Sequence, residues 1–232
     1  MLTYLQEKLI FQSYALSERH TFQFKHPFKE VFLTADDGAM LHGLHFTQTA
    51  PKGIILYFHG NRRSVDYWGE WAAKLAHLSA YEVVVMDYRG YGKSRGERRF
   101  ESMLNDGAMF YSYCKTFFPE DKITVFGRSL GGAFATHSVL GHTPSKLILE
   151  STFTNLIEVA QNKYWFLPLK TLIKYPFQND GNIAKLALET HFIHGTQDQL
   201  VYFGHSEKLY NLSSSFQKKM HPIEGGAHNN LR

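Results

Sequence analysis

The chain has 232 residues, 44% of them hydrophobic and 15% aromatic, so a single α/β domain over residues 1–232 can bury its core without disulfides or a structural metal. Its 25 Lys and Arg against 21 Asp and Glu give a net charge of +4, which is too small to favour a nucleic-acid partner. The single cysteine, Cys114, excludes an internal disulfide and favours a reducing, cytoplasmic location.

The start of the chain carries no targeting pattern. Residues 1–14, MLTYLQEKLIFQSY, lack the charged and the continuous apolar regions of a signal peptide. No run of about 18 apolar residues occurs, so we expect no transmembrane helix in this sequence. The sequence leaves open whether a membrane anchor is encoded upstream in a longer gene product.

Two alternating runs, residues 30–36 and 40–48, are joined by Asp37-Gly38, a pair typical of antiparallel hairpins. From Gly53 onward the predicted strands are continuous apolar runs, which is typical of parallel strands covered on both faces. These strands span residues 53–60, 82–88, 122–129, 146–152, 190–196 and 218–225, and they alternate with predicted helices at 65–79, 101–118, 130–141 and 203–214. The pattern predicts a mostly parallel sheet with helices on both faces and an N-terminal antiparallel hairpin.

Residues 151–188 interrupt this alternation. The segment is too long for a simple crossover and is rich in aromatic residues, so we expect either a decorated crossover helix or a small cap over a site. Phe153, Trp165, Phe166 and Leu169 are its candidate pocket residues. For Trp165, Phe166 and Leu169 core packing is the favoured interpretation, and contact with a membrane surface is the alternative.

The loop after residues 82–88 contains Gly92-Lys93-Ser94, which resembles the end of a phosphate-binding P-loop. A P-loop needs a glycine five residues before Gly92, and this chain has Asp87 there, an anion where phosphate oxygens would lie. Arg95-Gly96-Glu97 also keeps the chain in a turn where a helix would have to begin. We therefore expect no bound nucleotide.

Gly127-Arg128-Ser129-Leu130-Gly131 fits the pattern G-x-S-x-G, between a predicted strand and a predicted helix. At such a strained turn the residues two positions before and after the serine have little room for side chains, which explains the glycines. The following helix directs free N–H groups at the reacting oxygen. The pattern predicts Ser129 as a nucleophile.

A serine nucleophile needs a base and an acid that orients the base. Asp198 follows the strand-like run 190–196, and His228 lies on a glycine-rich turn after the last predicted strand. Their order after Ser129 is that of the motif's usual partners. Glu150, at the end of an earlier strand, is the alternative acid.

The backbone N–H of Leu130 and that of Asn61 are the candidate oxyanion donors, with Gly60 allowing close approach. His59 is expected to support that loop from a buried position. His191 and His194 are three residues apart on a predicted strand, as are His42 and His45, so each pair leaves opposite faces. We therefore expect no metal and no cofactor.

The motifs FHGN, DYRGYGKSRG, GRSLGG, ESTF, HGTQD and GGAH stand in one order along nearly the whole chain. With them the chain resembles the α/β-hydrolase superfamily, in its serine aminopeptidase-like and monoacylglycerol-lipase-like branch with a short lid. The resemblance implies the α/β-hydrolase fold, makes Gly92-Lys93-Ser94 a loop packed beside the active site, and makes residues 151–188 the lid. One departure is that only four residues follow His228, where relatives continue into a helix.

We therefore expect a serine hydrolase that cleaves carboxylic esters or thioesters through an acyl-enzyme on Ser129. The alternatives are a peptidase or amidase of the same fold and a binding protein without catalysis. The expected partner is a small acyl substrate, and the sequence leaves the oligomeric state undetermined. Five arginines follow two of the predicted strands and could steer anionic substrates: Arg62, Arg63, Arg95, Arg98 and Arg99.

Overall fold

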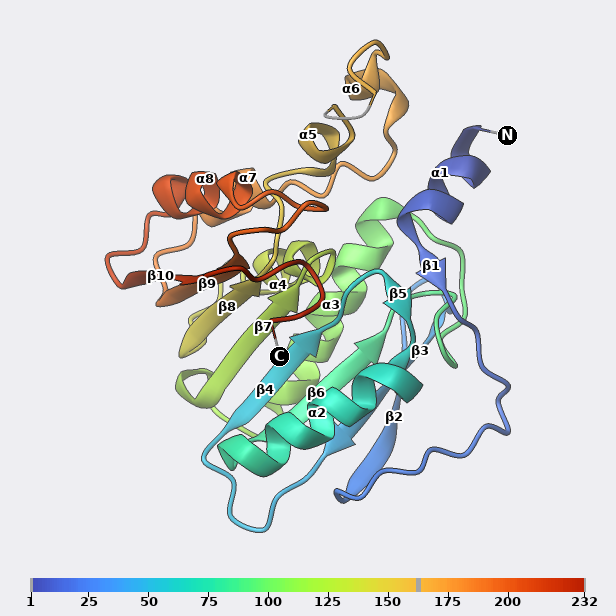
Figure 1. Ribbon diagram of the computed structural model, residues 1–232. Helices are drawn as coiled ribbons and strands as arrows, with labels where there is room; N and C mark the ends of the chain where they lie inside the picture. The colour runs from blue at the N-terminus through green and yellow to red at the C-terminus, as the bar shows by residue number, and fades with distance from the viewer. Residues whose placement is uncertain (1, 162–163, 232) are drawn as a thin grey trace.

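A computed structural model describes residues 2–161 and 164–231 and contains an eight-stranded mixed sheet (Figure 1). The strand order is β10-β9-β8-β7-β4-β6-β3-β2. The strands are β2 (Phe28–Thr34), β3 (Met40–Phe46), β4 (Ile54–Phe58), β6 (Glu82–Asp87), β7 (Ile123–Arg128), β8 (Lys146–Glu150), β9 (Thr190–Gly195) and β10 (Lys218–Ile223). From β6 to β10 all neighbouring strands are parallel, and only β2-β3 and β3-β6 pair antiparallel. The predicted mostly parallel sheet is confirmed.

The N-terminal hairpin forms where the sequence predicts it. Gly38 occupies the turn with φ +79°, a conformation that glycine adopts without steric cost. Ala35 N donates to Ala39 O over 2.9 Å, and β2 then pairs with β3 along its whole length.

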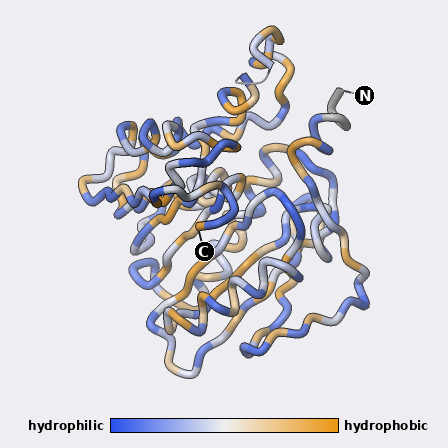
Figure 2. Tube along the Cα trace, in the orientation of Figure 1, coloured by the Kyte–Doolittle hydropathy of each residue, from blue (hydrophilic) through white to orange (hydrophobic). Residues whose placement is uncertain are grey.

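Helices cover both faces of the sheet because its central strands are apolar on both sides. In β4, Ile54, Leu56 and Phe58 belong to one buried cluster, whereas Ile55 and Tyr57 belong to another on the opposite face. Figure 2 shows these central strands as mainly hydrophobic. Helix α2 (Val65–Ser79) packs on the second cluster, and helices α3 (Phe100–Lys115) and α4 (Gly131–Ser138) pack on the first.

The remaining elements are short. They are α1 (Leu2–Ile10), a 3-10 turn (Glu120–Lys122), α5 (Leu156–Gln161), α6 (Leu169–Leu172), α7 (Asn179–Ile183), α8 (Gly204–Leu212) and a separate parallel pair, β1 (Gln12–Ser13) with β5 (Arg62–Arg63).

The segment between β8 and β9 projects from the body of the molecule, with α5 and α6 at its end near α1 (Figure 1). Gln6 Nε2 donates to Leu172 O over 2.7 Å, so α1 is tied to this segment. Leu169 is buried, as expected, but Trp165 and Phe166 are 81% and 65% exposed. The favoured core-packing interpretation is therefore wrong for these two residues. The physical reason is that α6 has only four residues, so the turn before it extends into solvent while Leu169 faces the core.

The loop after β6 is bonded within the protein. Lys93 Nζ lies 2.6 Å from Glu30 Oε2, and Ser94 Oγ donates to Asp87 O over 2.8 Å. A Cβ on Gly92 would lie 1.8 Å from Asp87 Oδ2, so Asp87 fills the space at this turn. These contacts favour a structural role for Gly92-Lys93-Ser94.

Arg89, in the same loop, is a buried cation whose guanidinium binds two carboxylates. Its Nε and Nη2 donate to the two oxygens of buried Asp106 over 2.7 and 2.8 Å, and Nη2 also lies 3.1 Å from Asp37 Oδ1. Two parallel hydrogen bonds of this kind are stronger than neutral ones. Arg89 thus joins the β2-β3 turn to α3.

Replacing Arg89 with Met should lower the free energy of unfolding by about 3–5 kcal/mol, because it leaves Asp106 buried without its counterion. Urea denaturation measures this change. Arg99→Met is the control, since Arg99 pairs with Glu97 on the exposed surface and its loss should leave the curve nearly unchanged. Equal midpoints for the two variants would contradict the structural role of Arg89.

Candidate active site

The turn between β7 and α4 holds Ser129 in a strained backbone conformation. Its φ is +52°, in the left-handed region that non-glycine residues rarely adopt. A Cβ on Gly131 would lie 2.0 Å from Phe58 O, and one on Gly127 would lie 2.7 Å from Gly131 O. Side chains at these two positions would therefore prevent the turn from forming against the end of β4.

Ser129, Asp198 and His228 meet at the carboxyl edge of the sheet. His228 Nε2 lies 3.1 Å from Ser129 Oγ, and His228 Nδ1 lies 2.7 Å from Asp198 Oδ2. All three side chains are largely buried, with exposures of 8% for Ser129 and His228 and 3% for Asp198. Three distant segments, after β7, β9 and β10, thus form one chain of polar contacts.

Glu150 takes a different partner. Its Oε1 accepts from Arg128 Nε over 2.7 Å, and both side chains are buried. The structure therefore places Asp198, and not Glu150, against the ring of His228.

Asp198 lies in a setting that favours its ionised form. Burial by itself would raise the pKa of Asp198, but hydrogen bonds from His194, His228 and the backbone N–H of Val201 outweigh it and hold the pKa well below its usual value. Because the folded-state pKa is lowered, the resulting stability is present at neutral pH and is lost as the pH falls through that value.

His194, which the sequence analysis considered only as part of a rejected metal pair, also belongs to this cluster. Its Nε2 lies 3.2 Å from Asp198 Oδ2 and 2.8 Å from Val201 O, and its Nδ1 lies 2.6 Å from Ser206 Oγ. The feature that could have predicted this contact is the position of His194, four residues before Asp198 and at a buried position of β9. His191, by contrast, leaves the other side of the strand and contacts His221.

The loop after β4 lies directly beside Ser129. A Cβ on Gly60 would be 3.9 Å from Ser129 Cβ, so the backbone of this loop approaches Ser129 closely. Asn61 O accepts from Tyr91 Oη over 2.7 Å and from Gln12 N over 3.1 Å, which fixes the orientation of the peptide. Within the described residues, the N–H groups of Asn61 and Leu130 donate no hydrogen bond to the protein.

His59 supports this loop from a fully buried position, as its place in the sequence suggested. Its Nδ1 lies 2.6 Å from Gly60 O, and Tyr88 Oη donates to His59 O over 2.7 Å. Its ring stacks on Trp68 with centroids 5.8 Å apart.

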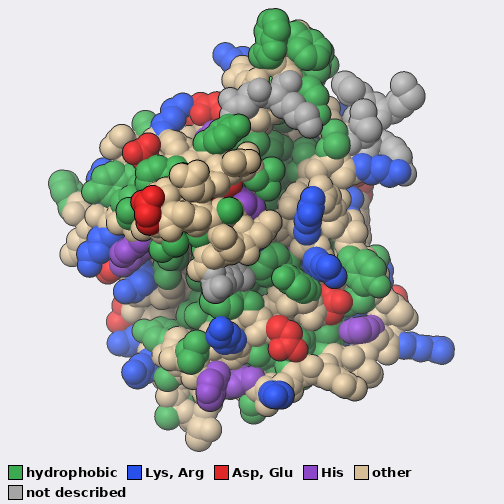
Figure 3. Space-filling model, viewed as in Figure 1, with side chains coloured by type: hydrophobic (Ala, Val, Ile, Leu, Met, Phe, Trp, Pro, Cys, Tyr) green, Lys and Arg blue, Asp and Glu red, His purple; other side chains and the backbone are tan. Residues whose placement is uncertain are grey.

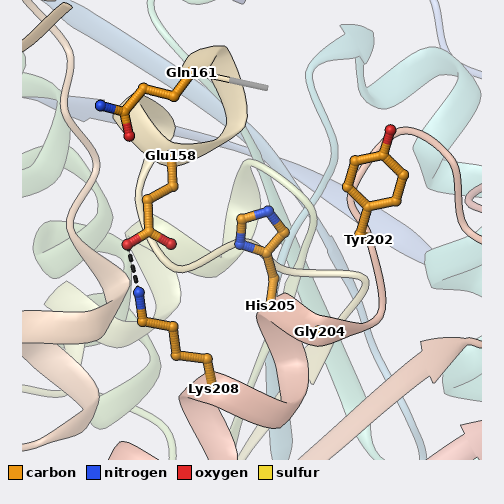
Figure 4. Close-up of a pocket in the computed structure, with 6 residues that line it drawn as sticks. All are labelled: Glu158, Gln161, Tyr202, Gly204, His205 and Lys208. Atoms are coloured by element: carbon orange, nitrogen blue, oxygen red, sulfur yellow. Dashed lines mark hydrogen bonds and ion pairs between the residues drawn. The ribbon is translucent and has the colours of Figure 1, made fainter. Parts of the chain in front are cut away.

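Two hollows lie near the carboxyl edge. One of about 310 Å³ is formed where α5 meets α8, and Figure 4 shows the ion pair of Glu158 and Lys208 across it. Another of about 620 Å³ lies beside His228 and is lined by Gln197, Gln199, Leu200, Ala227, Asn229 and Asn230 as well. The predicted pocket residues are not among the described residues that line these two hollows: Phe153, Trp165, Phe166 and Leu169. Phe153 is instead buried in the core.

Most of the predicted cationic rim is engaged within the protein. Arg95 Nη2 donates to Leu16 O over 2.6 Å, and Arg98 donates to Arg89 O and to Ser13 Oγ over 2.8 Å each. Arg99 pairs with Glu97. Of the five arginines, only Arg62 and Arg63, which are both exposed, remain candidates for steering anionic substrates.

The described part of the chain shows no group of three or more His, Cys, Asp or Glu residues that could hold a metal ion. In residues 2–161 and 164–231, every helix is too short or too polar to span a bilayer.

A strand-to-helix serine turn on a mostly parallel sheet, with an aspartate and a histidine supplied by later strands, defines the class of α/β-hydrolases. Within it, this chain belongs to the serine aminopeptidase S33 family, which it matches over residues 49–179.

Among its relatives is lysophosphatidylserine lipase ABHD12 of Danio rerio, which is 31% identical over 181 residues, 69% of this chain and 47% of the relative. The chain thus spans about half the length of the ABHD12 proteins that it matches.

Solved structures share the fold. Acetyl xylan esterase 1 from Thermoanaerobacterium sp. superposes with a TM-score of 0.73 at 19% identity, covering 92% of this chain and 82% of the esterase. An esterase from Pyrococcus furiosus superposes with a TM-score of 0.71 at 18% identity, covering 94% and 89%.

Replacing Asp198 with Asn should lower kcat for a short-chain ester on the order of 10³–10⁴-fold, because the neutral amide no longer holds the imidazole in the required tautomer. Glu150→Gln should retain most activity, since the amide oxygen still accepts from Arg128. Steady-state kinetics on both folded variants make the comparison, and a larger loss for Glu150→Gln would transfer the acid role to Glu150.

Proposed function

We propose that this protein is a serine hydrolase that cleaves carboxylic esters or thioesters through an acyl-enzyme on Ser129. The observation that carries the proposal is the contact of His228 Nε2 with Ser129 Oγ at 3.1 Å, with the other ring nitrogen on Asp198. A serine hydroxyl is a weak nucleophile until a base takes its proton, and His228 is placed to take it.

In the first half of the reaction Ser129 Oγ attacks the acyl carbon while its proton passes to His228 Nε2. The resulting oxyanion accepts hydrogen bonds from the N–H groups of Leu130 and Asn61, and one such donor is typically worth ~10²–10³ in rate. The bond to the leaving group then breaks, and His228 returns the proton to the departing oxygen or sulfur.

Water completes the cycle. His228 takes a proton from a water molecule, which attacks the acyl carbon, and the protonated histidine then restores the hydroxyl of Ser129 as the acid departs. Asp198 stays ionised throughout and stabilises the imidazolium without accepting its proton.

Ester cleavage is preferred over peptide cleavage because the ABHD12 relatives are named lysophosphatidylserine lipases. The family description, serine aminopeptidase, keeps amide hydrolysis as the second candidate. Both use the same residues, so a panel of acyl esters, thioesters and aminoacyl amides separates them. A binding protein without catalysis is disfavoured, because such a protein has no need for a nucleophile, base and acid in contact.

A fluorophosphonate probe should label the wild-type protein covalently, and Ser129→Ala should abolish the label because no other nucleophile contacts His228 among the described residues. Gel fluorescence measures the label, and circular dichroism checks that the variant is folded. Ser138→Ala, at a buried serine of α4, serves as the control and should label normally. Equal labelling of wild type and Ser129→Ala would falsify the proposal.

We further propose that residues 151–188 act as the lid and that its tip contacts a membrane surface. Three large apolar side chains are exposed at this tip: Trp165 by 81%, Phe166 by 65% and Leu167 by 41%. Figure 3 shows hydrophobic side chains gathered at this projecting end of the molecule. Residues 164–178 include the exposed Lys170 and Lys174 and no acidic residue, a composition that favours anionic lipid headgroups.

Replacing Trp165 and Phe166 together with Ser should weaken binding to vesicles of phosphatidylcholine and phosphatidylserine by at least about tenfold, since each buried aromatic contributes roughly 1.5–3 kcal/mol. Vesicle sedimentation measures the partition. Phe216→Ser removes a fully exposed phenylalanine outside the lid and is the matched control. If both variants bind as wild type does, the tip is not a membrane contact.

A further inference from the structure

Arg128, the residue directly before Ser129, is a buried cation. It is the last residue of β7 and is only 6% exposed. A buried guanidinium is costly unless charge and hydrogen bonds compensate it. Its partners therefore show why a cation is placed beside the nucleophile.

The guanidinium binds both the sheet and the loop that carries His228. Nε donates to Glu150 Oε1 over 2.7 Å, which supplies the counter-charge at the end of β8. Nη2 donates to the backbone oxygen of His228 over 2.6 Å and to Asn229 Oδ1 over 3.0 Å. The cation also lies over the ring of Trp68, with 5.1 Å between Cζ and the ring centroid.

Arg128 also borders the loop of the candidate oxyanion donor Asn61. A Cβ built on Gly60 would lie 3.2 Å from Arg128 Nη1 and 3.9 Å from Ser129 Cβ. The Arg128 side chain thus lies beside the loop of Gly60 and is hydrogen-bonded to the loop of His228. The backbone of Arg128 continues directly into Ser129.

We infer that Arg128 is a positioning residue that fixes His228 relative to Ser129, with Glu150 as its counterion. The inference rests on the proposed serine hydrolase function. The imidazole is held to Asp198 at its ring, and Arg128 holds the same residue at its carbonyl oxygen. These two contacts together fix both the position and the tilt of the His228 ring. With the Asp198 contact alone, the ring could rotate about that hydrogen bond.

Only arginine can make this set of contacts. Its planar group presents donors in several fixed directions and reaches Glu150, His228 and Asn229 together. A lysine at this position keeps the charge beside Glu150 but has a single nitrogen. Arg128→Lys therefore separates charge compensation from positioning.

The test compares Arg128→Lys and Arg128→Gly with wild type in ester hydrolysis and in fluorophosphonate labelling. Both variants should lose on the order of 10²-fold in kcat, the effect typical of a misplaced catalytic group, while KM changes little. Added guanidinium chloride at low concentration should restore part of the activity of Arg128→Gly, because the free ion can occupy the vacated space. It should not restore Asp198→Asn.

Arg89→Gly is the matched control, since it removes another buried arginine whose partners are Asp37 and Asp106. It should lower thermal stability but leave the labelling rate per folded molecule unchanged, and guanidinium should not affect that rate.

The inference is overturned if both Arg128 variants have the kcat of wild type per folded molecule. It is also overturned if the loss of activity in each variant is no larger than the fraction of unfolded protein. Failure of both variants to fold would also overturn it and assign Arg128 to stability alone. If wild type itself neither labels nor hydrolyses esters, the proposed function fails. An active wild type with unaffected Arg128 variants removes only the positioning role.

Discussion

The site depends on the close packing of the turn around Ser129 against the end of β4. Gly131 lies so near Phe58 O that a single added carbon would overlap it, and Ser129 has a positive φ that costs backbone strain. The strain is sustained because nearly all residues of α4 and all residues of β4 and β7 are buried. This packing brings Ser129, the start of α4 and the loop of Gly60 and Asn61 close together.

The parallel sheet supplies the rest of the site by its strand order. Strands β7, β8 and β9 are neighbours, so their carboxyl ends place Ser129, Glu150 and Asp198 along one edge. The turn after β10, the outermost strand, extends back along that edge to bring His228 to Ser129. Glu150 does not contact His228 in the described structure and pairs instead with Arg128, whose Nη2 donates to His228 O.

Two buried arginines show how the same side chain serves different ends. Arg89 binds Asp37 and Asp106 and joins the hairpin to α3, at a position that makes no contact with His228 or Ser129 among the described residues. Arg128 binds one carboxylate, that of Glu150, and its Nη2 donates to the backbone oxygen of His228 and to Asn229 Oδ1. The difference lies in the acceptors that each guanidinium contacts, since both side chains are buried.

Elements with local sequence signals were predicted correctly. Alternation and the Asp37-Gly38 turn identified the hairpin, and periodicity placed the helix at residues 65–79 where α2 lies. The glycines around Ser129 indicated the strained strand-to-helix turn, because backbone sterics act within a few residues. The order of serine, aspartate and histidine followed from family resemblance as well as from position after strands.

Which side chains contact one another depends on how the strands and loops pack in three dimensions. Whether Asp198 or Glu150 contacts His228 depends on the lateral order of strands, which no local pattern encodes. The roles of Arg95 and Arg98 likewise come from partners distant in sequence. Trp165 and Phe166 were predicted to lie in the core because they are apolar. Burial also requires a neighbouring surface to pack against, and the turn before the short α6 holds these two side chains away from such a surface.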